Sequence, residues 1–109
     1  MEPVDSSNLA TLTMNFNPMD ALIRICKKYK VDELYVFGSI LTQSFNKQSD
    51  IDFLVKFGDV DLYDYFDNYI DFKESLEDLF KRIVDILEVQ TLKNPILKRS
   101  IDRNKVKIY

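Results

Sequence analysis

The sequence predicts a small α/β or α+β domain in which helices pack against one mixed β-sheet. Apolar and polar side chains largely alternate over residues 51–57, which is typical of a half-buried strand. Between residues 61 and 80, large apolar side chains recur every three or four positions, which predicts a long helix. The chain has 109 residues, of which 46% are hydrophobic, so we expect a single domain with one hydrophobic core.

The N-terminal part is expected to form an arm followed by a helix. Residues 1–16 are polar and lack periodicity, which predicts a flexible arm in front of a single domain over residues 17–109. Asn17 and Pro18 are typical of a helix start, because asparagine caps the first turn and proline has no N–H to leave unpaired. Apolar side chains then repeat at helical spacing as far as Tyr29.

The later elements alternate between strands and helices. The apolar run at residues 34–37 predicts a buried strand that ends at Gly38, and a short helix is expected from Ser39 to about Phe45. The other expected elements are a loop at 46–49, a strand at 51–57, a helix from about 61 to 80, a strand at 83–89, a helix from 94 to about 104 and a last strand at 106–109.

The composition excludes several classes of chemistry. Cys26 is the one cysteine, so no internal disulfide can form, and its place in a helical apolar stripe favours a packing role. The chain has no histidine, which excludes histidine-based triads and nearly every zinc site. No apolar run approaches the roughly 18 residues of a membrane span, and the N-terminus lacks the basic region of a signal peptide. We therefore expect a cytoplasmic protein.

The net charge of −3 conceals two regions of opposite sign. Residues 50–88 carry twelve acidic and four basic side chains, whereas residues 93–107 carry six basic side chains and one acidic one. The acidic region argues against non-specific binding of duplex nucleic acid. The basic region is either a solvated helix face or a docking surface for an acidic stretch of a partner.

Three carboxylates are candidates for chemistry. Asp50 and Asp52 are two positions apart on a predicted strand and therefore point to the same face. Asp85 lies within an apolar run, where burial of an unpaired carboxylate costs several kcal/mol. If the two strands are neighbours, each pair of carboxylates repels by about 4 kcal/mol at about 4 Å and an effective dielectric of about 20. Such oxygen ligands suit Mg²⁺ or Mn²⁺, although an Asp-x-Asp pair alone is more often an exposed strand end.

Gly38 and Ser39 supply the second feature that a phosphate site needs. Glycine lets the backbone approach an anion closely, and Ser39 begins a predicted helix whose free N–H groups favour phosphate. The serine hydroxyl can cap this helix or bind a phosphate oxygen. A strand that ends in Gly-Ser, followed by Asp-x-Asp on the next strand, would place a phosphate cradle beside a metal-binding pair, where two ions stabilise the attacking and leaving oxygens of phosphoryl transfer.

Together these motifs resemble those of the DNA polymerase β-type nucleotidyltransferases. Phe37-Gly38-Ser39 is followed after ten residues by Asp50-Ile51-Asp52, and Asp85 is similar to the third strand carboxylate of that superfamily. The resemblance extends over about residues 17–109. The short chain is similar to minimal nucleotidyltransferases, the MntA-like antitoxins that accompany HEPN-domain toxins.

The resemblance implies a fold, a reaction and a role for each of these residues. It implies that Gly38 and Ser39 bind the triphosphate of ATP, and that Asp50, Asp52 and Asp85 hold two Mg²⁺ or Mn²⁺ ions. Asp85 would also be the candidate base for the attacking hydroxyl. Members of this type transfer AMP from ATP to a tyrosine of the HEPN toxin and so silence its RNase activity.

One departure from the pattern and two alternatives remain. Minimal members often carry Arg-Gly where this chain has Thr42 and Gln43, which removes a cation near the phosphates, and Lys47 could substitute for that charge. One alternative is an antitoxin of the same fold that neutralises its toxin by binding alone. The other is transfer to a small molecule such as an aminoglycoside, which generally needs a further domain to hold the acceptor.

Overall fold

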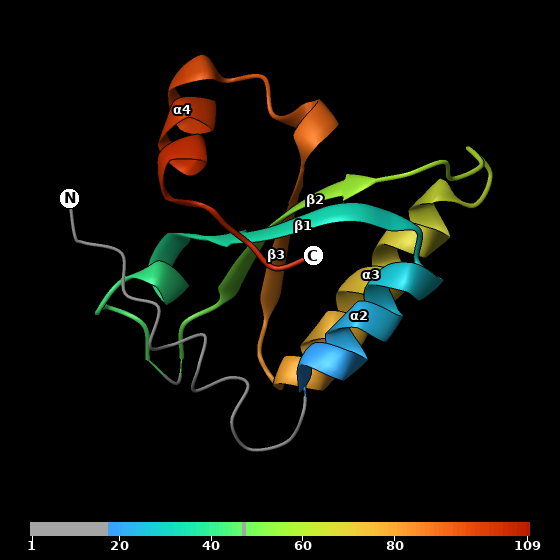
Figure 1. Cartoon of the computed structure of the whole chain (residues 1–109), viewed down its shortest axis with the longest axis horizontal. Coiled ribbons are helices and arrows are strands. Elements are labelled where there is room, and N and C mark those ends of the chain that lie inside the picture. The colour runs from blue at the N-terminus through green and yellow to red at the C-terminus, as the bar shows by residue number, and fades with distance from the viewer. Residues whose placement is uncertain (1–17, 47) are drawn as a thin grey trace.

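A computed structural model describes residues 18–46 and 48–109, and in this part of the chain a four-stranded sheet is combined with three α-helices and two short 3-10 helices (Figure 1). The elements are α2 (Pro18–Lys28), β1 (Val31–Phe37), η1 (Gly38–Leu41), β2 (Ile51–Phe57), α3 (Tyr65–Phe80), β3 (Val84–Glu88), η2 (Val89–Thr91), α4 (Pro95–Asn104) and β4 (Val106–Lys107). The order across the sheet is β3-β2-β1-β4. β2 and β3 are parallel and the other pairs are antiparallel, so the predicted mixed sheet is confirmed.

Helix α2 begins the described fold and contributes to the core. Asp20 lies in its first turn and Lys27 and Lys28 in its last, where each charge is favoured by the helix dipole. Leu22 and Cys26 are fully buried against the sheet, and burial raises the pKa of the Cys26 thiol to about 12. The thiol therefore stays protonated and packs, as predicted. Asn17 and the predicted arm, residues 1–16, lie outside the described residues.

The hydrophobic core lies between one face of the sheet and the helices α2 and α3, which lie side by side (Figure 1). Antiparallel pairing places Leu34 opposite Val55 and Val36 opposite Phe53, so these four side chains share that face. Phe72 of α3 is fully buried against them. Each such side chain contributes about 1.5–3 kcal/mol through burial.

The opposite face of the sheet is partly covered by α4. Leu54 of β2 alternates with the core residues and is buried outside the main core cluster, and Ile101 of α4 is also buried outside it. The Lys105 ammonium, directly after α4, lies 4.4 Å from the centre of the Tyr35 ring on this face. Asn94 caps α4 by accepting hydrogen bonds from the N–H groups of Ile96 and Leu97, which confirms the predicted helix start.

Helix α3 begins later than the sequence predicted. The apolar spacing suggested a start near Asp61, but the helix begins at Tyr65. Asp61 instead forms a turn, in which its carboxylate accepts the N–H of Tyr63 and its carbonyl accepts the N–H of Asp64. Leu62 and Phe66 were expected in the core stripe of this helix, but they are 86% and 72% exposed because no element covers them among the described residues. Tyr63, between them in the sequence, is 94% exposed.

Several predicted boundaries also change. The predicted strand at 51–57 is confirmed as β2, whereas β1 begins three residues earlier than predicted, at Val31. The short helix predicted over 39–45 is a single 3-10 turn, η1, because the hydroxyl and the N–H of Thr42 both donate to the Ser39 carbonyl and close it. β3 and β4 are shorter than predicted. None of the helices in the described ranges is long and apolar enough to cross a membrane.

Candidate functional site

The predicted site residues lie where three segments of the sheet meet. β1 and β2 are antiparallel, so the end of β1 lies beside the start of β2, and Phe37 pairs with Asp52. β2 and β3 are parallel, and their register places Asp52 directly across from Asp85. Gly38 and Ser39 follow β1 in η1 at the same end of the sheet. The fold therefore gathers the Gly-Ser turn and two strand carboxylates at one place.

Gly38 lies against the Asp52 side chain. Its φ of +78° is in the left-handed region, which glycine adopts without the steric cost that a Cβ would add. A Cβ at this position would overlap the Oδ2 atom of Asp52 and lie 3.2 Å from its Cγ atom. Glycine is thus required here because the backbone passes close to an anionic group, which in this structure is the Asp52 carboxylate.

Asp52 is a strongly perturbed carboxylate. Its side chain is half-buried, and burial raises its pKa to about 6, with further contributions from the negative charges of Asp85 and Asp50. All three effects disfavour the charged form. At neutral pH, a cation beside Asp52 would therefore be favoured electrostatically.

Asp85 is exposed, contrary to the expectation that it is buried in its apolar run. β3 is an edge strand, and its side chains alternate, so Val84 is buried in the core while Asp85 lies on the opposite face. The apolar neighbours of Asp85 in the sequence therefore do not surround it in the fold. Its exposure leaves it accessible to a ligand or a second substrate.

The donor set suits a hard divalent cation in part. Asp52 and Asp85 offer carboxylate oxygens from adjacent positions on neighbouring strands, which is the ligand chemistry that Mg²⁺ and Mn²⁺ prefer. Across residues 18–46 and 48–109, no group of three or more acidic or cysteine side chains is arranged to hold a metal ion. The fold therefore supplies a pair of candidate ligands, and participation of Asp50 as a third stays a prediction.

Arg82 organises the loop that precedes Asp50, a role that was not predicted from the sequence. Its guanidinium Nη1 donates to the carbonyls of Asn46, at 2.7 Å, and Ser49, at 3.0 Å. The guanidinium also lies 4.3 Å from the centre of the Phe45 ring. These contacts join the start of β3 to the loop before β2. A basic residue in an acidic region was the one available signal, and it does not reveal partners more than 30 positions away.

The positions after Ser39 carry no positive charge. Thr42 is used to close the η1 turn, and Gln43 is exposed. Lys47, the predicted substitute for the missing cation, lies outside the described residues. In the described part of this segment, the Gly38-Ser39 turn therefore has no cation of its own.

Comparison with known proteins assigns this fold to a family. Residues 20–109 match the family model described as polymerase beta, nucleotidyltransferase. Two proteins of Methanocaldococcus jannaschii named as protein adenylyltransferases, MJ1379 and MJ0128, are each 35% identical to this chain. The first match covers 71% of this chain and 76% of the relative, and the second covers 72% and 76%.

Solved structures show the same fold. A minimal nucleotidyltransferase has a TM-score of 0.66 at 26% identity, over 81% of this chain and 86% of that one. A toxin–antitoxin structure with AMP-PNP has a TM-score of 0.64 at 18% identity, over 84% and 72% of the two chains. A complex of tri-AMPylated Shewanella oneidensis HEPN toxin with MNT antitoxin has a TM-score of 0.57 at 18% identity, over 84% and 69%. The family match and the curated relatives establish that this chain belongs to the polymerase beta nucleotidyltransferases.

Proposed function

We propose that this nucleotidyltransferase moves AMP from ATP to a hydroxyl group of a protein partner, with the help of a divalent metal, and that the partner is a HEPN-type toxin which the modification neutralises. The observation that carries the proposal is the pairing of Asp52 with Asp85 beside the Gly38-Ser39 turn. Relatives named as protein adenylyltransferases support the reaction, and the fold neighbours that are toxin–antitoxin complexes support the kind of partner.

Each residue of the site has a role in this proposal. The backbone of Gly38 and the hydroxyl of Ser39 would bind the triphosphate, and Asp50, Asp52 and Asp85 would hold two Mg²⁺ ions. When bound, Mg²⁺ would offset the charge of the carboxylates and phosphates and stabilise the oxygens at which charge develops. Burial raises the pKa of Asp52, and the negative charges of Asp85 and Asp50 raise it further, so a cation at this place would stabilise the charged carboxylate.

The reaction is a displacement at the α-phosphorus of ATP. The acceptor oxygen forms a bond to the α-phosphorus, the bond from that phosphorus to the β-phosphate oxygen breaks, and pyrophosphate leaves. Asp85 would take the proton of the acceptor hydroxyl, since it is exposed and lies across from Asp52. The acceptor residue is proposed to be a tyrosine.

An exposed apolar surface supports a protein acceptor. Leu62 and Tyr63, just before α3, and Phe66, in its first turn, are exposed, and exposed apolar groups of this size commonly mark protein interaction sites. Asp61, Asp64 and Asp67 lie among them, so a complementary partner surface would be apolar with basic side chains around it.

A second candidate function is neutralisation by binding alone. It is favoured by one observation, the absence of a cation at Thr42 and Gln43, which would weaken nucleotide binding. No feature of the described residues favours transfer to a small molecule.

Intact-mass spectrometry of a reconstituted reaction tests the proposal. The purified protein is mixed with ATP, MgCl₂ and a candidate HEPN-domain partner from the same organism, and the HEPN protein is expected to gain the mass of one or a few AMP groups. Asp52→Asn and omission of MgCl₂ should each abolish the gain. A HEPN protein that is inhibited in a stable complex but gains no mass would instead establish neutralisation by binding.

A further inference from the structure

Strand β3, which carries Asp85, pairs on one side only. Within the described residues, β2 is the one strand that pairs with it. The N–H of Ile51, the first residue of β2, donates to the carbonyl of Ile83, just before β3. Successive residues of a strand direct their backbone groups to opposite sides, so the N–H of Val84 and the carbonyl of Ile86 face away from β2. Such groups at a sheet edge have no strand partner.

Side chains of α3 bind the free edge of β3 on either side of Asp85. The Glu77 carboxylate accepts the N–H of Val84 through its Oε2 atom at 3.0 Å. The Tyr69 hydroxyl donates to the carbonyl of Ile86 at 3.3 Å. Asp85 is thus the residue between two peptide groups that α3 holds.

A third contact continues this pattern along the strand. Burial raises the pKa of Tyr65, and a hydrogen bond with the Glu88 carboxylate raises it further, so the phenol stays protonated and donates to Glu88. Tyr65 and Tyr69 are about 6 Å apart along α3, which is close to the rise of about 6.6 Å between Ile86 and Glu88. One turn of the helix therefore matches two residues of the strand.

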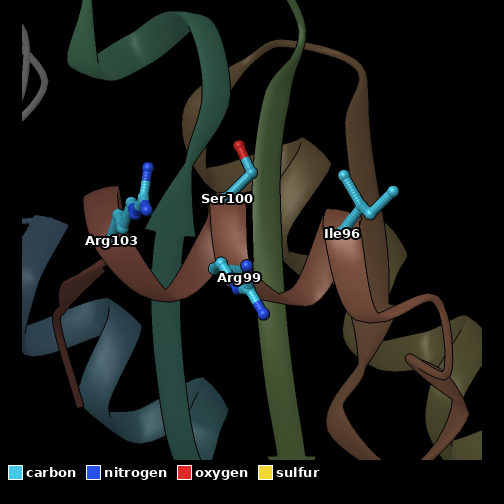
Figure 2. A pocket seen from close by; sticks show the side chains of 4 residues that line it. All are labelled: Ile96, Arg99, Ser100 and Arg103. Carbon is cyan, nitrogen blue, oxygen red and sulfur yellow. The ribbon is translucent and has the colours of Figure 1, made fainter.

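The hollow on α4 is not part of this arrangement. Figure 2 shows α4 crossing β1 and β2. A hollow of about 240 Å³ on this helix is lined by four exposed side chains, those of Ile96, Arg99, Ser100 and Arg103. Ile101, on the other side of the helix, is buried. The hollow therefore belongs to the outer surface of α4, and the hydrogen bonds beside Asp85 come from α3.

We propose that Glu77 and Tyr69 are positioning residues for nucleotidyl transfer, because they hold the peptide groups on either side of Asp85 and so keep its carboxylate across from Asp52. The assignment rests on the proposed function, in which Asp85 takes the proton of the acceptor hydroxyl. Pairing with β2 fixes one edge of β3, and the side chains of α3 fix the other. Misplacement of a reacting group by about 1 Å lowers a rate by as much as about a hundredfold, so these hydrogen bonds affect the rate although neither side chain acts on the substrate.

Transfer kinetics of Tyr69→Phe/Glu77→Ala test the assignment. The first change removes only the hydroxyl and keeps the ring, and the second removes the acceptor. This double variant is expected to lower kcat at least about tenfold while changing the KM for ATP by less than about threefold. Glu77→Gln alone should keep kcat within about twofold of the wild type, because its amide oxygen also accepts the Val84 N–H. The matched control, Glu74→Ala, removes the same charge from an exposed position of α3 and should leave kcat unchanged.

The Asp85→Asn background distinguishes positioning from general stability. If α3 acts through Asp85, adding Tyr69→Phe/Glu77→Ala to Asp85→Asn should lower kcat by less than about twofold more. ¹⁵N relaxation dispersion of the metal-free protein gives a readout without catalysis. The double variant should show exchange over residues 84–88 that the wild type lacks, with residues 31–37 of β1 unchanged. Circular dichroism melts verify that all variants fold.

The outcomes separate this assignment from the proposed function. Equal kcat in the wild type and in Tyr69→Phe/Glu77→Ala would overturn the assignment while nucleotidyl transfer stands. An equal fall of kcat in the wild-type and Asp85→Asn backgrounds would do the same, because the two side chains would then act on the whole fold. Failure of the wild type to transfer AMP, with ATP, MgCl₂ and the HEPN protein present, would overturn both.

Discussion

Gly38 and Asp52 are packed so closely that the turn after β1 has no room for a side chain beside the carboxylate. The glycine therefore serves two purposes, since it permits the left-handed backbone of the turn and leaves the Asp52 oxygens in place at the start of β2. A steric contact of this kind couples the Gly38-Ser39 turn to the Asp52 carboxylate. The coupling can be measured.

Substitution of Gly38 by alanine should destabilise the fold and abolish transfer. The left-handed backbone alone costs a non-glycine residue about 1–2 kcal/mol, and overlap with Asp52 adds to it. Urea unfolding of Gly38→Ala, Asp52→Ala and the double variant gives the interaction free energy between the two residues. We expect Gly38→Ala to lower the free energy of unfolding less in the Asp52→Ala background than in the wild type. Additive losses would show that the two residues do not interact.

Replacement of Asp52 by asparagine should stabilise the metal-free protein while abolishing transfer. The carboxyl pKa is raised from 3.8 to about 6 on folding, so the folded state binds more protons than the unfolded chain between these values. The free energy of unfolding therefore falls as the pH rises from about 4 to about 6 and stays low above it. At pH 7.5 we expect Asp52→Asn to be more stable by about 1 kcal/mol, allowing for solvent screening.

Thermal melts across this pH range check the expectation. The exposed acid Asp59, changed to asparagine, is the control and should leave the pH profile unchanged. Addition of MgCl₂ should raise the melting temperature of the wild type but not that of Asp52→Asn. A large loss of stability in Asp52→Asn would mean that the carboxylate has a structural role.

Removal of the Arg82 guanidinium should reduce the turnover number. Arg82→Ala loses two hydrogen bonds and the contact with Phe45, which together stabilise the loop before Asp50 by about 1–3 kcal/mol. Arg82→Lys should rescue little, because a lysine does not present the planar fork. We expect kcat to fall more than the KM for ATP rises. The control is Lys56→Ala, which removes an exposed positive charge away from this loop. An equal fall in kcat in this variant would show that the loss of positive charge, and not the position of the loop, lowers kcat.

Polar substitution of the exposed apolar residues should affect the partner and not the fold. Leu62→Ser/Tyr63→Ser/Phe66→Ser is expected to change the free energy of unfolding by less than about 0.5 kcal/mol per site, whereas the buried Phe72→Ala costs about 3–5 kcal/mol. Binding to the HEPN protein, measured by surface plasmon resonance, should weaken at least about tenfold. Unchanged binding would place the partner on another surface.

The elements that the sequence predicted well are those with local causes. The alternation in β2 and the Asn94 cap of α4 depend on residues a few positions apart, and both are confirmed. The start of α3 was predicted wrongly because Leu62 extends the helical spacing into a segment that forms a turn. Spacing reports which side chains share a face, but it does not report whether anything covers that face.

The candidate site was predicted only in part, because only some of its features depend on residues close together in the sequence. The Gly-Ser and Asp-x-Asp spacing led to residues that the fold brings to one end of the sheet. The exposure of Asp85 depends on the position of β3 at the sheet edge, and the contacts of Arg82 join segments distant in sequence. Neither is encoded in a local pattern.

The parallel pairing of β2 with β3 has a consequence for the order in which activity can appear during folding. β1 and β2 form an antiparallel hairpin, but Asp85 reaches Asp52 only after α3 has crossed the sheet and β3 has added at its edge. Transient detachment of α3 and β3 would separate the two carboxylates while the hairpin persisted. Amide exchange at Val84, whose N–H donates to Glu77 of α3, should then report the lifetime of the assembled site.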